Sequence, residues 1–86
     1  MMERGEKKGE MEWRLLILDY LFKNGQENNH IRSIAKGIGT STITATKYLY
    51  YYLGLGLINT REYTNHQLFS INEKGIEELK KLKGGN

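Results

Sequence analysis

Residues 34–58 read IAKGIGTSTITATKYLYYYLGLGLI, two segments of helical periodicity separated by a glycine-rich turn. From Ile31 to Ile38 an apolar residue recurs at i, i+3, i+4 and i+7, which predicts a short helix with one buried face that ends in this turn. Ser41 or Thr40 can then cap a longer helix that runs to about Leu53. The segment therefore predicts two helices joined by a short turn.

The longer helix should bury one stripe and expose the opposite one. Its shared apolar face consists of Ala45, Leu49, Tyr52 and Leu53. At 3.6 residues per turn, burying that face turns four other side chains to solvent, namely Ile43, Thr44, Lys47 and Tyr51. An outward tyrosine beside a lysine and small hydroxyl residues is typical of a surface that meets phosphates and base edges.

The flanking segments predict the remaining elements. EMEWRLLILDYLFKNG predicts a helix, and the polar loop after it offers Asn28 or Asn29 as the cap of the next helix. LINTREY and LFSIN, joined by the turn TNHQ, predict a β-hairpin, and Asn72 can cap a last helix, EKGIEELKKLK. We therefore expect a mainly helical α+β fold: three helices, a hairpin and a C-terminal helix, within one domain at 10–83 and with disordered ends at 1–9 and 84–86.

Composition narrows the function. The chain has 86 residues, a net charge of +3 and no cysteine, so we expect one domain, a polyanionic partner and no thiolate metal site. No acidic residue occurs from Asn28 to Arg61, a window that contains Arg32, Lys36 and Lys47. Neither a signal peptide nor a membrane span is evident, which favours a cytoplasmic location.

Catalytic and metal chemistry are not expected. His30 and His66 are the only histidines, and although Glu27 and Glu62 precede them, no third ligand is in view. The serines have no evident base, and no loop has the pattern of a phosphate cradle. We predict no enzyme activity, no cofactor and no metal.

Taken together, these patterns resemble a known family. Residues 34–58 resemble the helix-turn-helix of winged-helix transcription regulators, with Ala35 in the second helix, Gly39 in the turn and Ser41 at the cap. FSINEKGIEEL resembles the segment that follows the wing in that family. The pattern, which covers about residues 14–80, is most similar to MarR-like and ArsR-like regulators and to small winged-helix proteins of archaea and their viruses. Gly37 and Gly54 depart from it.

The resemblance implies binding to double-stranded DNA, with the helix from Ser41 to Leu53 in the major groove. Arg32 and Lys36 would position phosphates, and the wing tip would reach the backbone or the adjacent minor groove. The outward helix face carries Ile43, threonines and Tyr51 where such regulators often have arginines, which argues against strong non-specific binding and leaves specific readout open. The implied DNA-binding residues are Arg32, Lys36, Ser41, Thr42, Ile43, Thr44, Lys47, Tyr48, Tyr51, Arg61, Asn65, His66 and Gln67.

Oligomeric state and one alternative function stay open at this level. The first helix carries a second apolar stripe, which indicates either an unusually buried helix or a homodimer interface. The expected interface residues, from the first or the last helix, are Trp13, Leu16, Tyr20, Ile76, Leu79 and Leu82. A dimer would bind a palindromic or pseudo-palindromic site. The alternative is a protein-interaction module that uses Tyr48, Tyr50 and Tyr51, and stacking of single-stranded nucleic acid on these rings is a third possibility.

Overall fold

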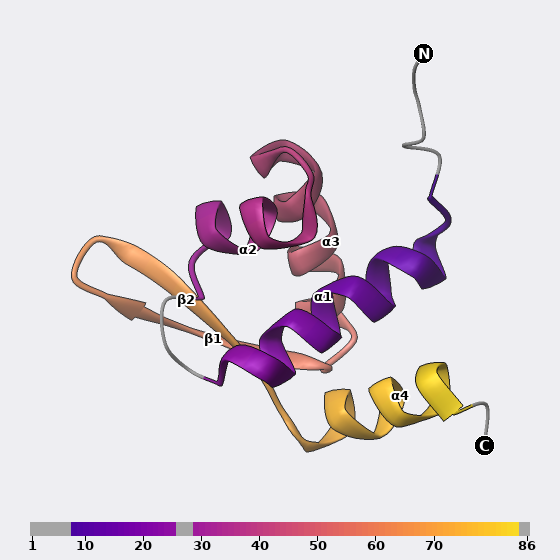
Figure 1. Cartoon of the computed structure of the whole chain (residues 1–86). Helices are drawn as coiled ribbons and strands as arrows, with labels where there is room; N and C mark the ends of the chain where they lie inside the picture. The colour runs from indigo at the N-terminus through magenta and orange to yellow at the C-terminus, as the bar shows by residue number, and fades with distance from the viewer. Residues whose placement is uncertain (1–7, 26–28, 85–86) are drawn as a thin grey trace, which may run out of the picture.

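The computed structural model describes residues 8–25 and 29–84 and has the expected fold class, mainly helical α+β. Four helices surround one antiparallel hairpin (Figure 1). The elements in chain order are α1 (Glu10–Asn24), α2 (Ile31–Ile38), α3 (Thr42–Gly54), β1 (Ile58–Tyr63), β2 (His66–Ile71) and α4 (Glu73–Gly84). The expected disordered ends lie mostly outside the described residues, and α4 includes Gly84.

The helix caps follow local chemistry, with one difference from the prediction. Ser41 caps α3 by accepting a hydrogen bond from the amide of Thr44, and Asn72 caps α4, as expected. The cap of α2, however, is His30, whose Nδ1 accepts from the amide of Ser33 at 3.3 Å. Asn28 lies outside the described residues. Asn29 is instead buried and donates its side-chain amide to the carbonyl of Gly25 at the end of α1.

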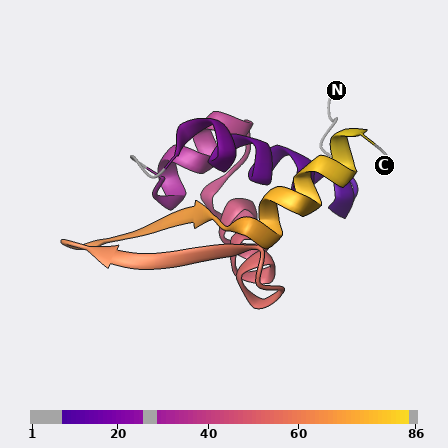
Figure 2. The same cartoon turned by 90° about the horizontal axis from the view of Figure 1, so that it is seen from below.

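The turn of the hairpin is tighter than predicted. Pairing runs from Ile58 with Ile71 to Tyr63 with His66, so Thr64 and Asn65 alone form the turn. His66 and Gln67, expected in the turn, belong to β2. Seen from below, the hairpin extends away from the helices as a long arm (Figure 2).

The core lies between the helices and the base of the hairpin. The expected stripe of α3 is buried, with Ala45, Leu49 and Tyr52 fully enclosed and Leu53 half-buried. The other members of the core are Ile17, Leu18, Leu21, Ile34, Ala35, Leu57, Ile58, Phe69 and Leu79.

The second apolar stripe of α1 is largely covered within the chain, which corresponds to the first of the two alternatives, an unusually buried helix. Trp13 is only 7% exposed because it stacks on Tyr48, with the ring centroids 5.7 Å apart. Tyr20 packs over Gly37, which explains a glycine inside α2. Leu79 is buried in the core. The remaining predicted interface residues, Leu16, Ile76 and Leu82, are half-buried.

Polar contacts fix α4 against α1. Arg14 donates to Glu78 of α4 at 2.6 Å and to Glu10 of α1 at 3.0 Å. Burial lowers the pKa of Arg14, but the hydrogen bonds to the two carboxylates outweigh burial, and the net effect is a raised pKa.

The described residues contain no helix long and apolar enough to cross a membrane, and no group of three or more potential metal-ligating side chains.

Candidate nucleic-acid interface

The outward face of α3 presents uncovered side chains at the N-terminal half of the helix. Ile43 is 81% exposed, the largest exposure of any large hydrophobic residue described. Thr42 and Lys47 are also exposed, whereas Thr44 is half-buried. An isoleucine this exposed gains nothing from the core, so the fold itself does not account for its presence.

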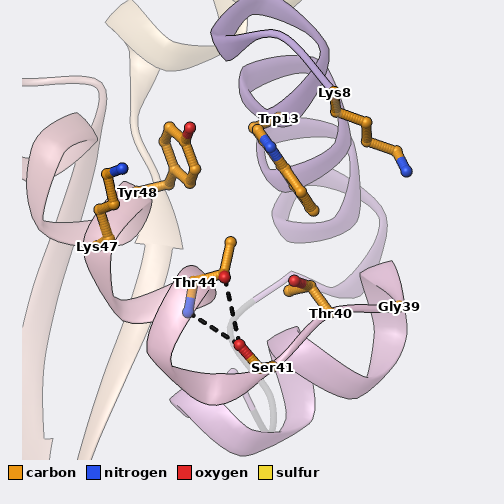
Figure 3. Close-up of a pocket in the computed structure, with 8 residues that line it drawn as sticks. All are labelled: Lys8, Trp13, Gly39, Thr40, Ser41, Thr44, Lys47 and Tyr48. Carbon is orange, nitrogen blue, oxygen red and sulfur yellow. Dashed lines mark hydrogen bonds between the residues drawn. The ribbon is translucent and has the colours of Figure 1, made fainter. Parts of the chain in front are cut away.

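Hydrogen bonds order the first turns of α3. Ser41 accepts from the amide of Thr44 at 3.1 Å and donates its hydroxyl hydrogen to Thr44 Oγ1 at 3.2 Å (Figure 3). Thr46 donates to the carbonyl oxygen of Thr42 at 2.6 Å. Ser41 therefore acts first as a cap, and the hydroxyl hydrogen of Thr44 stays available for an outside acceptor.

The four tyrosines of α3 divide by environment. Tyr52 is fully buried, and its hydroxyl donates to Glu10 Oε2 at 2.8 Å. Burial, together with the neighbouring Glu10 carboxylate, raises the pKa of Tyr52. Tyr48 is half-buried and stacks on both Trp13 and Tyr52, so most of its ring serves packing rather than a partner surface.

The other two tyrosines remain at the surface. Tyr51 is exposed, and its ring is tilted over that of Tyr52. Tyr50 is also exposed, but its hydroxyl donates to Gln67 Oε1 of β2, and its ring meets Phe69 edge-on. Tyr50 thus ties the outward side of α3 to the hairpin. Gln67, predicted as a DNA contact, already has a partner for its side-chain oxygen.

A cavity of about 710 Å³ opens beside the N-terminal turns of α3. Figure 3 shows the neighbouring rings of Trp13 and Tyr48 among the residues that line it. Lys8 lies over Trp13 and Lys47 over Tyr48, each ammonium 5.3 Å from a ring centroid. The lining residues are Lys8, Trp13, Gly39, Thr40, Ser41, Thr44, Lys47 and Tyr48. Sequence reasoning missed Lys8, which it assigned to a disordered tail.

The hairpin places its polar side chains on two faces. Cross-strand pairing puts Arg61, Tyr63 and His66 on one face, because residues directly opposite or two apart on a strand share a face. Arg61 lies over the ring of Tyr63, 5.9 Å from its centroid. Asn65 is exposed at the turn.

Charge separates the molecule into two sides. Asp19 of α1 pairs with Lys23 and with Lys83 of α4, at 3.1 and 3.2 Å. By contrast, within residues 8–25 and 29–84, Arg32, Lys36 and Lys47 form no ion pair. The α1/α4 side is therefore largely neutralised, whereas the α2/α3 side keeps its positive charge.

Comparison with known proteins identifies the fold. No protein-family model and no curated protein matches the sequence. The structure is similar to that of a mutant of S. aureus MepR bound to an oligodeoxyribonucleotide, with a TM-score of 0.75. The two chains are 17% identical over 86% of this chain and 60% of the MepR chain. The chain has a winged-helix fold. In this fold the β1–β2 hairpin is the wing, and α2 and α3 form the helix-turn-helix. The chain spans about 60% of the length of the MepR chain.

Proposed function

We propose that this chain is a sequence-specific regulator of transcription that binds double-stranded DNA, with α3 in the major groove and the wing on the backbone or minor groove. The carrying observation is the uncovered, unpaired face of α3, where Ile43 is 81% exposed beside Thr42 and Lys47. The winged-helix fold, and the oligodeoxyribonucleotide bound to MepR, support the same proposal.

The chemistry of this face suits base-edge contacts. The major groove accepts an α-helix, and apolar side chains there read the methyl group of thymine. Ile43 is the apolar side chain in position to do so. Thr44 keeps a hydroxyl donor for a base edge or phosphate, and Lys47 supplies the charge. With only one cation on this face, affinity would depend on such specific contacts more than on charge.

The remaining basic residues suit phosphate positioning. Arg32 and Lys36 are exposed one turn apart on the same side of α2. Arg61 and Asn65 would bring the wing to the backbone or the minor groove beside the site. Tyr51 would contact sugar or phosphate, whereas Tyr48 would contribute mainly by holding α3 against α1.

A homodimer remains part of the proposal, on a changed surface. Met11 and Phe22 of α1 are 50% and 51% exposed, and with half-buried Leu15 they fall within about 40° of one another around the helix axis. An exposed apolar stripe of this length on one helix suits pairing with a second copy. Two α3 helices would then lie about 34 Å apart, one DNA turn. Sedimentation of the chain and of Phe22→Glu tests this: a dimer that the substitution dissociates supports it, and a wild-type monomer contradicts it.

Selection of bound fragments from a pool of random duplexes tests the proposed function. We expect a common sequence to be enriched, arranged as an inverted repeat if the dimer forms. Lys47→Ala should weaken binding to that sequence, whereas Lys80→Ala, an exposed lysine on α4, should not. Recovery of the input pool without enrichment would argue against sequence-specific binding.

The second candidate function is a protein-interaction module, and the exposure of Tyr50 and Tyr51 favours it. Retention on random duplex DNA at low salt separates the two functions. A DNA-binding regulator should be retained and eluted by salt, whereas an interaction module should pass through. The cytoplasmic location and the archaeal or viral origin remain predictions from the sequence.

A further inference from the structure

The two histidines of the sequence, remote from one another in the chain, meet where α2 joins the wing. Their rings stack with centroids 5.4 Å apart and planes inclined by 25°. In Figure 1 this is the junction between the start of α2 and the hairpin. A cavity of about 440 Å³ lies there, lined by His30, Ile31, Arg32, Asn65, His66 and Gln67. The described residues bring no third histidine and no carboxylate or thiol to the pair. The site therefore offers donors and positive charge, which suit an anion.

Backbone and cap contacts fix the position and the tautomer of His30. Its backbone pairs with Leu68 of β2 as an isolated bridge, and Phe69 donates its amide to the carbonyl of Asn29 at 2.9 Å. As the cap of α2, His30 accepts at Nδ1 from the amide of Ser33. An accepting Nδ1 carries no hydrogen, so the neutral ring carries its hydrogen on Nε2. Nε2 lies 3.0 Å from Ser33 Oγ, so its N–H would be shared between that hydroxyl and an anion in the cavity.

His66 has no such restraint. It lies on the exposed wing, opposite Tyr63 in the ladder, and shares a face with Arg61. Arg32 of α2 lines the cavity with it. Glu62 lies on the opposite face of the hairpin by the alternation of strand side chains, and Glu27 is outside the described residues. A phosphate oxygen among these groups interacts more favourably with the imidazolium form of His66 than with the neutral form.

We propose that this cavity binds a backbone phosphate of duplex DNA, with Arg32 as the fixed charge, His30 as a neutral donor, and His66 taking up one proton when the phosphate binds. The inference rests on the proposed function and adds a contact and a regulation to it. Because the charged form of His66 is favoured in the complex, its contribution is fully present at low pH and is lost as pH rises. Affinity for DNA would therefore increase on acidification, at constant salt.

The test is the affinity of the wild-type chain for its selected duplex between about pH 5.5 and 8.5, the range in which imidazoles titrate. One proton taken up gives up to about a tenfold loss of affinity per pH unit within the window where His66 changes charge. His66→Gln should flatten this dependence while keeping the preferred sequence. His30→Asn keeps a good cap for α2, so the fold should be retained. The variant lacks the donor of His30 and should bind several-fold more weakly, but it should retain the pH dependence because His66 is unchanged.

Two further measurements sharpen the result. Titration calorimetry in buffers of different ionisation enthalpy should count about one proton taken up by the wild-type chain and none by His66→Gln. The double variant His30→Asn/His66→Gln contains no histidine, so its binding should not change with pH across the imidazole range. An equal pH dependence in wild type and His66→Gln would overturn this inference alone. Absence of wild-type binding to any duplex at any pH would overturn the proposed function and this inference together.

Discussion

Replacing Gly75 by alanine should destabilise the fold, although alanine is the better helix former. Gly75 lies in the first turn of α4 and is buried against the end of the α3–β1 connection. A Cβ there would overlap the carbonyl oxygen of Leu57 and lie 2.7 Å from Cγ1 of Ile71. The carbonyl belongs to the backbone and cannot rotate away, so α4 would have to move by about 1 Å to restore ordinary contacts.

The size of the effect follows from three contributions. Overlap in a packed site costs about 2 kcal/mol. Moving the first turn of α4 also weakens two hydrogen bonds, each worth about 1 kcal/mol. In one, the Gly75 amide donates to Asn72 Oδ1 at 2.9 Å, and in the other the Asn72 amide donates to the Leu57 carbonyl at 3.3 Å. Alanine returns about 1 kcal/mol through helix propensity. The net loss is about 3 kcal/mol, which corresponds to a fall in Tm of roughly 12–24 °C.

Gly54→Ala is the matched control. Gly54 ends α3, is exposed, and has no heavy atom within 4 Å of its added Cβ, so this substitution should raise stability by about 0.5 kcal/mol. Urea unfolding of both variants and of the wild type, followed by circular dichroism, measures the two changes. If Gly75→Ala were as stable as the wild type or as Gly54→Ala, the close approach of α4 to Leu57 would be refuted.

Three further predictions concern charge and the wing. Lys47→Ala should reduce the slope of log affinity against log salt concentration by about one unit without changing the preferred sequence. The control Lys80→Ala should leave the slope unchanged. An unaltered slope in Lys47→Ala would mean that Lys47 does not contact a phosphate. Tyr50→Phe removes the hydroxyl bonded to Gln67 but keeps the ring against Phe69. The free energy of unfolding should therefore fall by less than about 1 kcal/mol, while hydrogen exchange of the β2 amides accelerates. Unchanged exchange would mean that this hydrogen bond does not hold the wing. Burial raises the pKa of Asp19, but the ion pairs with Lys23 and Lys83 outweigh burial, and the net effect is a lowered pKa. Asp19→Asn should therefore lower the free energy of unfolding by less than about 1 kcal/mol at neutral pH, and this difference should disappear as pH falls through the lowered pKa. A difference that persists in acid would contradict the ion-pair explanation.

The parts of the fold that depend on local chemistry could be predicted from the sequence. The 3.6-residue period identified the buried stripe of α3, and small polar residues identified the caps Ser41 and Asn72. Gly39, which the sequence placed in the turn, has a φ of 79°, the left-handed conformation in which glycine commonly ends a helix. Each of these features depends on residues within a few positions of one another.

Features that depend on contacts between distant segments were missed. The stack of Trp13 on Tyr48 helps to cover a stripe that the sequence left open between an unusually buried helix and a homodimer interface. Its companion, Tyr20 on Gly37, left one usable signal, since a glycine inside a helical pattern often marks a close approach. The His30–His66 pair left none, because it depends on the pairing of β2 with the segment before α2.

We propose above that the outward face of α3 and the wing meet a DNA duplex. Titration of isotopically labelled protein with its selected duplex, followed residue by residue through the backbone amide resonances, tests this most directly. We expect the largest changes to fall on residues 30–36, 41–51 and 61–67, while α4 changes little. Changes concentrated on α1 and α4, or no change on α3, would contradict it.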